Sequence, residues 1–93
     1  MRVVVTGMGV VSPIGTGIDQ FWDAATQGTS GISSIQCFDA SNQHSRIAGQ
    51  IHEFDPTSFM SAKQIEQTDR FTQLALRAAG LALEDAGSLE SYE

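Results

Sequence analysis

The chain has 93 residues, 41% of them hydrophobic, and eleven acidic against five basic residues give a formal net charge of −6 at pH 7. This length allows one small domain at most. The acidic balance argues against nucleic-acid binding, which needs a basic stripe to neutralise phosphates, and the apolar runs are too short to span a bilayer. A single cysteine and the absence of a signal-peptide pattern favour a reducing, cytoplasmic location.

The first third of the chain contains one expected strand and one expected helix. Arg2–Thr6 is a run of β-formers that predicts a buried strand. A glycine-punctuated connection, Gly7–Gly17, follows it. A helix is expected to begin between Thr16 and Asp19 and to end before Gly28, which suits a left-handed cap.

The middle third is expected to be mostly irregular. Thr29–Gln43 is rich in Ser, Gly and Asn and is predicted to be a loop. Its expected apolar anchors are Ile32, Ile35 and Phe38. A short second strand is predicted over Arg46–Ile51.

The last third contains the strongest helix pattern. Pro56 biases Asp55 away from a helical conformation, so a turn is predicted at Phe54-Asp55-Pro56. Ser61 and Gln64 have the spacing of a capping box, which predicts that a short helix begins there. A long helix is predicted from about Asp69 to Ala86, with Gly87 just past its end. One face of it carries Phe71, Leu74, Ala75, Ala78 and Ala82. Because this face is rich in alanine, it lets another backbone approach closely, and little else in the 93 residues is expected to cover it.

The glycines after the first strand invite a dinucleotide-binding interpretation. In that motif three glycines precede a helix whose N-terminus binds the phosphates. Here Ser12 stands at the third glycine position, Pro13 follows it, and the helix pattern begins several residues later. Gly7 and Gly9 are therefore expected to serve a sharp turn or tight backbone packing, and no cofactor site is predicted.

Five segments in order resemble the β-ketoacyl-acyl-carrier-protein synthases and the related polyketide ketosynthases. The opening Arg2–Gly15 looks like their first strand and loop, and Thr68–Gly87 looks like the helix before their second long core strand. Between these lie Phe21-Trp22, Gly28-x-x-Gly31-Ile32, and Phe38-Asp39 with Arg46-Ile47-Ala48-Gly49. The resemblance covers nearly the whole chain.

The resemblance implies an α/β protein with the thiolase-like five-layered αβαβα fold, of which residues 1–93 are the incomplete N-terminal segment of the β-ketoacyl synthase domain. It also implies a decarboxylative Claisen condensation. In this family a cysteine at a helix N-terminus carries the acyl group, and two histidines and a lysine support the reaction. No organic cofactor is implied, and the full-length protein is expected to be dimeric.

No catalytic residue is expected within this chain. Cys37 matches no nucleophile position of the family and has no helix N-terminus directly after it, so nothing near it would activate the thiol. His44 and His52 match none of the family's catalytic histidines, and with Cys37 they have no metal-ligand spacing.

One surface carries over from the resemblance. Ser61–Asp69 aligns with a basic segment that helps to dock the acidic acyl carrier protein in fatty-acid elongating members, and Lys63 retains that charge. Glu66 and Gln67 stand where those enzymes often have basic residues, which would weaken the attraction. Lys63 is therefore the candidate docking residue, with a plain solvated lysine as the alternative.

A second interpretation of the whole protein stays open. Gln67-Thr68-Asp69 and the residues after it also resemble chain-length factors, which share the fold, lack the nucleophile and pair with an active ketosynthase. We favour the enzyme because it is the commoner member of the family. A freestanding binding module is weaker, since it leaves the last helix uncovered and does not account for the five segments.

Overall fold

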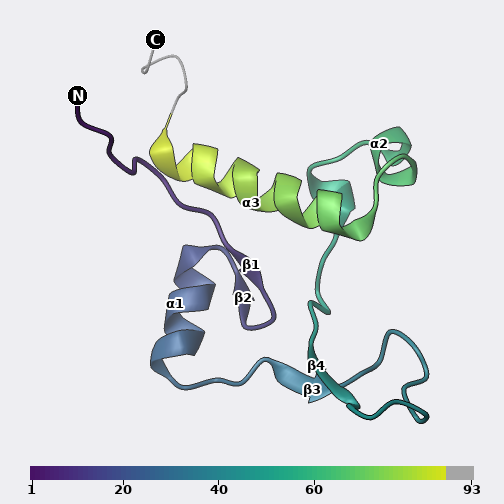
Figure 1. The fold of residues 1–93 in the computed structure, drawn as a ribbon. Coiled ribbons are helices and arrows are strands. Elements are labelled where there is room, and N and C mark those ends of the chain that lie inside the picture. Colours follow the sequence, from purple (N-terminus) through teal and green to yellow (C-terminus); the bar gives the residue numbers. More distant parts are fainter. Residues whose placement is uncertain (88–93) are drawn as a thin grey trace. The chain divides into compact units, whose positions relative to one another are not determined.

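A computed structural model describes residues 1–87 of the chain as short strands and three α-helices (Figure 1). In chain order the elements are β1 (Val11–Ser12), β2 (Gly15–Thr16), α1 (Ile18–Thr26), β3 (Ile32–Ser34), β4 (Ile47–Gly49), the 3₁₀ helix η1 (Pro56–Ser58), α2 (Ala62–Glu66) and α3 (Arg70–Ala86). They fall into two compact units. One holds Met1–Val11 with the chain from Asp55 onward, and the other holds Ser12–Phe54. Over residues 1–87, no helix combines the length and apolar character needed to cross a membrane.

In the unit formed by Ser12–Phe54, α1 begins and ends where the sequence predicted. Gly17 precedes it with a φ of 90°, and Gly28 follows with a φ of 73°. Both values lie in the left-handed region that glycine adopts without steric cost. Phe21 is half-buried, whereas Trp22 is 65% exposed. The helix thus covers its own unit with only part of its apolar surface.

The small sheet of this unit was predicted only in part. β4 lies within the expected Arg46–Ile51, but β3 lies in the predicted loop and pairs with it antiparallel, Ser33 opposite Ala48. The side chain of Gln50 extends the pairing, since it donates to the Ser34 carbonyl at 2.9 Å. A three-residue strand is too short to show a period in sequence, so the loop prediction failed there.

The expected apolar anchors of the same loop also differ from the prediction. Ile35 is half-buried, but Ile32 and Phe38 are each 55% exposed. Ala40 is the buried residue of this segment. A small side chain therefore takes the interior position expected for the larger ones.

The predicted buried strand at the N-terminus is wrong for the chain as described. Arg2–Thr6 forms no strand, and Val3, Val4 and Val5 are 92%, 70% and 80% exposed. A buried strand needs a neighbour on each side for its backbone hydrogen bonds. Within residues 1–87 the structure pairs no strand with this segment.

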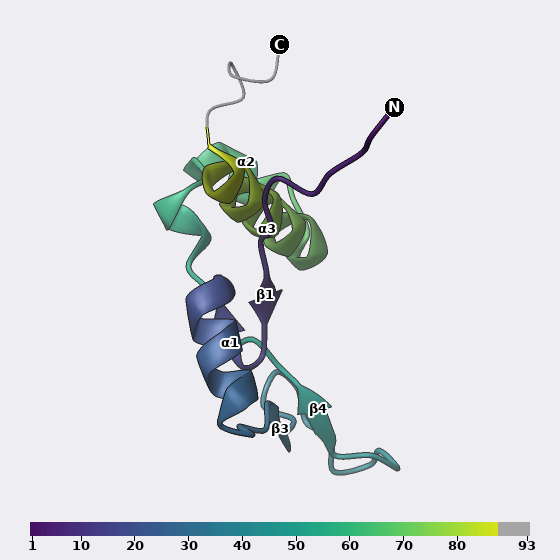
Figure 2. The ribbon, with the colours of Figure 1, turned by 90° about the vertical axis from the view of Figure 1, so that its left-hand side faces the viewer.

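In the other unit, the segment around Gly7 and Gly9 lies against α3 (Figure 2). A β-carbon added at Gly7 would lie 2.6 Å from the backbone nitrogen of Ala86, and one added at Gly9 would lie 2.6 Å from that of Ala82. The predicted tight backbone packing is therefore confirmed. The expectation that this face of α3 has little to cover it was wrong over its C-terminal half, where the glycine segment packs on it.

The N-terminal half of α3 presents a different surface. Phe71 in its first turn is 71% exposed, and Ala75 is exposed as well. Gln73, between them, is buried. The predicted apolar face is thus covered at one end of the helix and open at the other.

Candidate functional site

The predicted docking helix, α2, begins with the capping box expected from sequence. The Ser61 hydroxyl accepts from the Gln64 amide at 3.2 Å, and the Gln64 side chain accepts from the Ser61 amide at 2.9 Å. These reciprocal bonds satisfy two backbone donors that the start of a helix leaves unpaired. The first residue of the helix is thereby held firmly.

The end of α2 is closed by two side chains that lie outside it. The Thr68 hydroxyl donates to the Gln64 carbonyl at 2.7 Å. The Gln73 side-chain amide, from α3, donates to the Ile65 carbonyl at 3.3 Å and to the Thr68 carbonyl at 3.3 Å. Gln73 therefore links the end of α2 directly to α3.

The segment before α2 adds an apolar base. Asp55 caps η1 by accepting from the Thr57 amide at 3.0 Å, and Met60, directly before the cap of α2, is only 8% exposed. The Arg77 guanidinium of α3 lies 5.6 Å from the centroid of the Phe59 ring, within the range of a cation–π contact. Residues from η1, α2 and α3 thus pack together.

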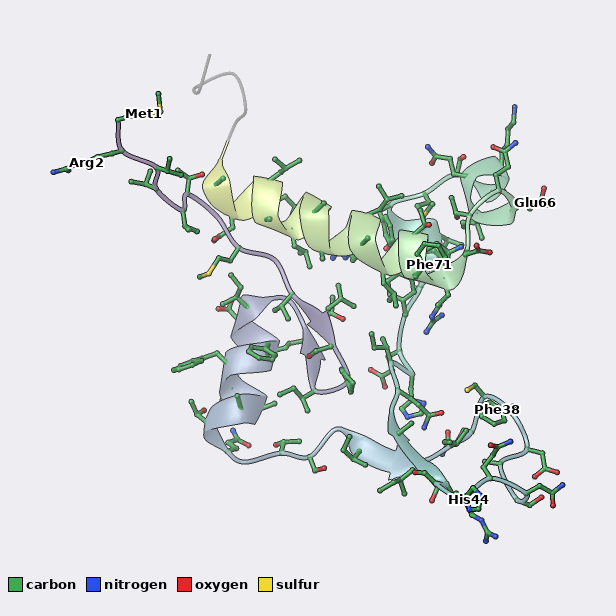
Figure 3. The ribbon with its side chains drawn as sticks, in the orientation of Figure 1. Met1, Arg2, Phe38, His44, Glu66 and Phe71 are labelled. Atoms are coloured by element: carbon green, nitrogen blue, oxygen red, sulfur yellow. The ribbon has the colours of Figure 1, made fainter. Side chains whose placement is uncertain are left out.

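Lys63 lies exposed on α2, as the docking prediction requires. No ion pair joins it to another of residues 1–87. Glu66, one turn further along, is also exposed and is marked with Phe71 in Figure 3. With one positive and one negative charge on a five-residue helix, the local field is close to neutral.

The dipole of α2 does not explain why a positive charge stands at Lys63. Lys63 stands two residues after the Ser61 cap, and a positive charge at the start of a helix is mildly unfavourable. Because α2 has only five residues, Lys63 belongs to its first and its last turn alike. The dipole of so short a helix therefore neither favours nor disfavours the charge.

The other candidate residues, Cys37, His44 and His52, belong to no group suited to a metal ion within residues 1–87. Cys37 is an exposed free thiol, and His44 lies in the same loop between β3 and β4, where Phe38 also lies (Figure 3). His52 is exposed beyond β4. No helix begins in this loop, and no group of His, Cys, Asp and Glu suited to a metal ion occurs among the described residues.

The dinucleotide interpretation also lacks its geometry. The helix that follows the glycine segment, α1, begins only at Ile18, nine residues after Gly9. Gly7 and Gly9 instead meet the backbone of α3, so the space that a pyrophosphate would need is filled by that helix.

Gln73 is the residue of this site that sequence reasoning missed. It stands four residues after Asp69 and four before Arg77, on a face that the apolar pattern did not mark. A polar side chain in a helix is usually solvated. Only the position of α2 reveals that this one is buried and bonded.

The comparisons with known proteins identify the family. The sequence model described as "Beta-ketoacyl synthase, N-terminal domain" matches residues 1–92, so the chain belongs to the β-ketoacyl synthase family. It is 45% identical over 86 residues to 3-oxoacyl-[acyl-carrier-protein] synthase 2 of Vibrio harveyi, covering 92% of this chain and 21% of that protein. It is 47% identical over 85 residues to the tetracenomycin polyketide synthase ketoacyl synthase beta subunit of Streptomyces glaucescens, covering 91% of this chain and 21% of that protein.

A solved structure gives the fold. The ishigamide ketosynthase/chain length factor matches with a TM-score of 0.86 and 34% identity, over 97% of this chain and 22% of that chain. The expected α/β, thiolase-like fold class is thereby confirmed. The chain spans about a fifth of the length of the relatives it matches.

Proposed function

We propose that the protein to which this chain belongs is a β-ketoacyl-acyl-carrier-protein synthase. The reaction joins an enzyme-bound acyl thioester to a malonyl thioester on the carrier protein. The malonyl group loses CO₂, its α-carbon forms the new C–C bond with the acyl carbonyl carbon, and the enzyme thiol leaves. The product is a 3-oxoacyl thioester on the carrier.

The observation that carries this proposal is the family match over residues 1–92, together with 44–45% identity to 3-oxoacyl-[acyl-carrier-protein] synthases 2 from two bacteria. Within the chain, the exposed Lys63 on a doubly capped α2 supports a role in docking the acidic carrier.

The catalytic groups belong to the rest of the protein in this proposal. Cys37 is exposed in a loop, and no helix starts beside it. Residues 1–93 contribute the N-terminal segment of the synthase domain, and this segment alone neither accepts an acyl group nor condenses malonyl thioester. The reaction needs no organic cofactor.

The test is a condensation assay on the full-length protein with radiolabelled acyl and malonyl carrier proteins. Formation of 3-oxoacyl carrier protein with release of CO₂ is the expected result. The isolated 93-residue chain, assayed in parallel, is expected to give neither product nor a labelled protein band. A full-length protein that neither takes up the acyl label nor releases CO₂ from malonyl carrier protein would refute the enzyme proposal.

One observation favours a second candidate, a chain-length factor. The 47% identity to a ketoacyl synthase beta subunit is as high as that to the fatty-acid type enzymes, and the matching solved structure is a ketosynthase/chain length factor. Such a protein would be a heterodimer with a ketosynthase partner, whereas the enzyme would form a homodimer. Condensation that appears only after a ketosynthase subunit is added would decide for this alternative.

A further inference from the structure

We propose that Gln73 is a positioning residue for carrier-protein docking: through its side-chain amide, α3 sets the orientation of α2 and so the place of Lys63. The inference rests on the proposed function, because it concerns the same docking surface. Gln73 itself would touch neither the carrier nor any substrate.

Gln73 is buried and makes several hydrogen bonds through its side chain. It is 8% exposed and is the buried polar side chain of the described residues. Its Nε2 lies within 3.2 to 3.3 Å of three oxygens: the Ile65 carbonyl, the Thr68 carbonyl and the Thr68 hydroxyl. Turning this buried amide away from these oxygens would leave its N–H donors unpaired, so the contacts favour one orientation of the side chain.

The helix α2 is too short to fix its own direction. A helix of five residues does not persist on its own, because nucleation is unfavourable and few hydrogen bonds follow it. Its direction must come from what holds its ends. The start is held by a capping box internal to the segment, which has no bond to α3. At the end of α2, the Thr68 hydroxyl donates to the Gln64 carbonyl, and the Gln73 side chain donates to the Ile65 carbonyl, so Gln73 joins this end to α3 by a hydrogen bond.

The charges on α2 are of opposite sign and lie close together. Lys63 sits two residues before Ile65, and its own carbonyl accepts from the Gln67 amide at 3.2 Å, so it turns with the end of the helix. Glu66 lies beside it with the opposite charge. When the net charge of a surface is small, its attraction for an acidic partner depends on which charge faces the partner. Lys63 and Glu66 are three residues apart and so are neighbours on the helix surface, and fixing α2 therefore decides which of the two charges lies nearer the partner.

The experiment measures the Kd of the full-length protein for acyl carrier protein at low and high salt. Gln73→Leu removes the donors at similar volume, and Gln43→Leu, at an exposed loop position, is the matched control. Gln73→Leu is expected to raise Kd about two- to fivefold at low salt, the size of one exposed charge contact, with the difference lost at high salt. Gln43→Leu should leave Kd unchanged.

A double variant separates positioning from a general structural effect. If Gln73 acts through Lys63, then Gln73→Leu has no further effect on Kd once Lys63→Gln is present. An equal effect in both backgrounds, or an unchanged Kd in the single variant, overturns the inference. Should Gln73→Leu not fold, Thr68→Val takes its place and Thr68→Ser, which keeps the hydroxyl, should restore binding.

The Kd for the carrier protein and the condensation reaction are measured separately, so the role of Gln73 and the proposed function can fail independently. Carrier binding needs no catalysis, so a protein that binds the carrier through Lys63 but does not condense refutes the enzyme and leaves the role of Gln73 standing. A protein that condenses but whose Kd for the carrier does not depend on Gln73 refutes the role of Gln73 and leaves the proposed enzyme standing.

Discussion

The backbone amide of Met8 donates to the carboxylate of Asp85 at 3.0 Å, across 77 positions of the sequence. Asp85 is the penultimate residue of α3, where a negative charge is unfavourable against the helix dipole. The bond gives this charge a partner. It also fixes the segment of Gly7 and Gly9 on the end of the helix, in the same place where the two backbones touch.

The bond between Met8 and Asp85 predicts different effects for two substitutions. In the full-length protein, Asp85→Ala should lower the free energy of unfolding by about 1 kcal/mol, because it removes a hydrogen bond to a charged group at an exposed site. Asp85→Asn keeps an acceptor and removes the unfavourable charge, so its stability should equal or exceed that of the parent. Urea midpoints provide the measurement. Glu84→Ala, at the neighbouring exposed position, is the control, and identical losses for the two alanine variants would contradict the prediction.

The contact of Gly9 with α3 predicts that Gly9→Ala destabilises the protein by about 1–3 kcal/mol, since a β-carbon there overlaps backbone atoms that cannot move aside. Gly80→Ala is the matched control on α3, because nothing lies within 4 Å of a β-carbon at that position. It should be neutral or stabilising by up to about 1 kcal/mol from helix propensity. Thermal melts check both variants. NAD or NADP should change neither melt, and micromolar binding that Gly9→Ala abolishes would revive the dinucleotide interpretation.

The charges of α2 predict that two substitutions change the KM for carrier-bound substrate in opposite directions. Under the proposed function, Lys63→Glu in the full-length protein should raise the KM for carrier-bound substrate severalfold with little change in kcat, and Glu66→Arg should lower that KM. Both effects should shrink with salt, because exposed charges are screened over about 10 Å at 0.1 M. Arg46→Glu makes the same change in net charge in the other unit and serves as control. If both α2 variants leave KM unchanged at low salt, docking lies on residues outside this chain.

The exposure of Cys37 predicts that it can be modified without loss of activity. Under the proposed function, the full-length protein should react with a maleimide at this residue and keep the condensing rate of the untreated protein, and Cys37→Ser should behave like the parent. Peptide mass spectrometry locates the modification. A labelled acyl group that is bound as a thioester on Cys37 and disappears in Cys37→Ser would show that the residue is a nucleophile after all.

The cap of η1 predicts a pH effect at acid pH. The hydrogen bonds from the Thr57 side chain and backbone hold the pKa of Asp55 below its ordinary value of 3.8. A lowered pKa in the folded state means that the cap stabilises η1 above the ordinary value and that this contribution is lost as the pH falls through the folded pKa. Carboxyl NMR shifts should show the lowered pKa of Asp55, and Thr57→Val should raise it, because only the backbone amide then remains. An unchanged pKa in Thr57→Val would contradict this cause.

Local signals in the sequence were sufficient for the helices. The limits of α1 and α3 follow from an apolar period of 3.6 and from Gly28 and Gly87, and the capping box of α2 follows from Ser61 and Gln64 alone. These are interactions between residues a few positions apart, so the sequence contains everything that determines them. The exposure of Lys63, the candidate docking residue, follows equally from its place on a short polar helix.

Only the tertiary structure decided where distant backbone segments meet. The valines of Arg2–Thr6 are β-formers, but a strand forms only beside another strand, and no pairing is present for them in residues 1–87. β3 became a strand because β4 lies next to it, which its own three residues could not indicate. In the sequence Gln73 cannot be told from a solvated glutamine, whereas in the structure it is buried and bonded to α2. Pairing, burial and hydrogen bonding between remote residues depend on their distance in space, and the order of residues along the chain does not contain that distance.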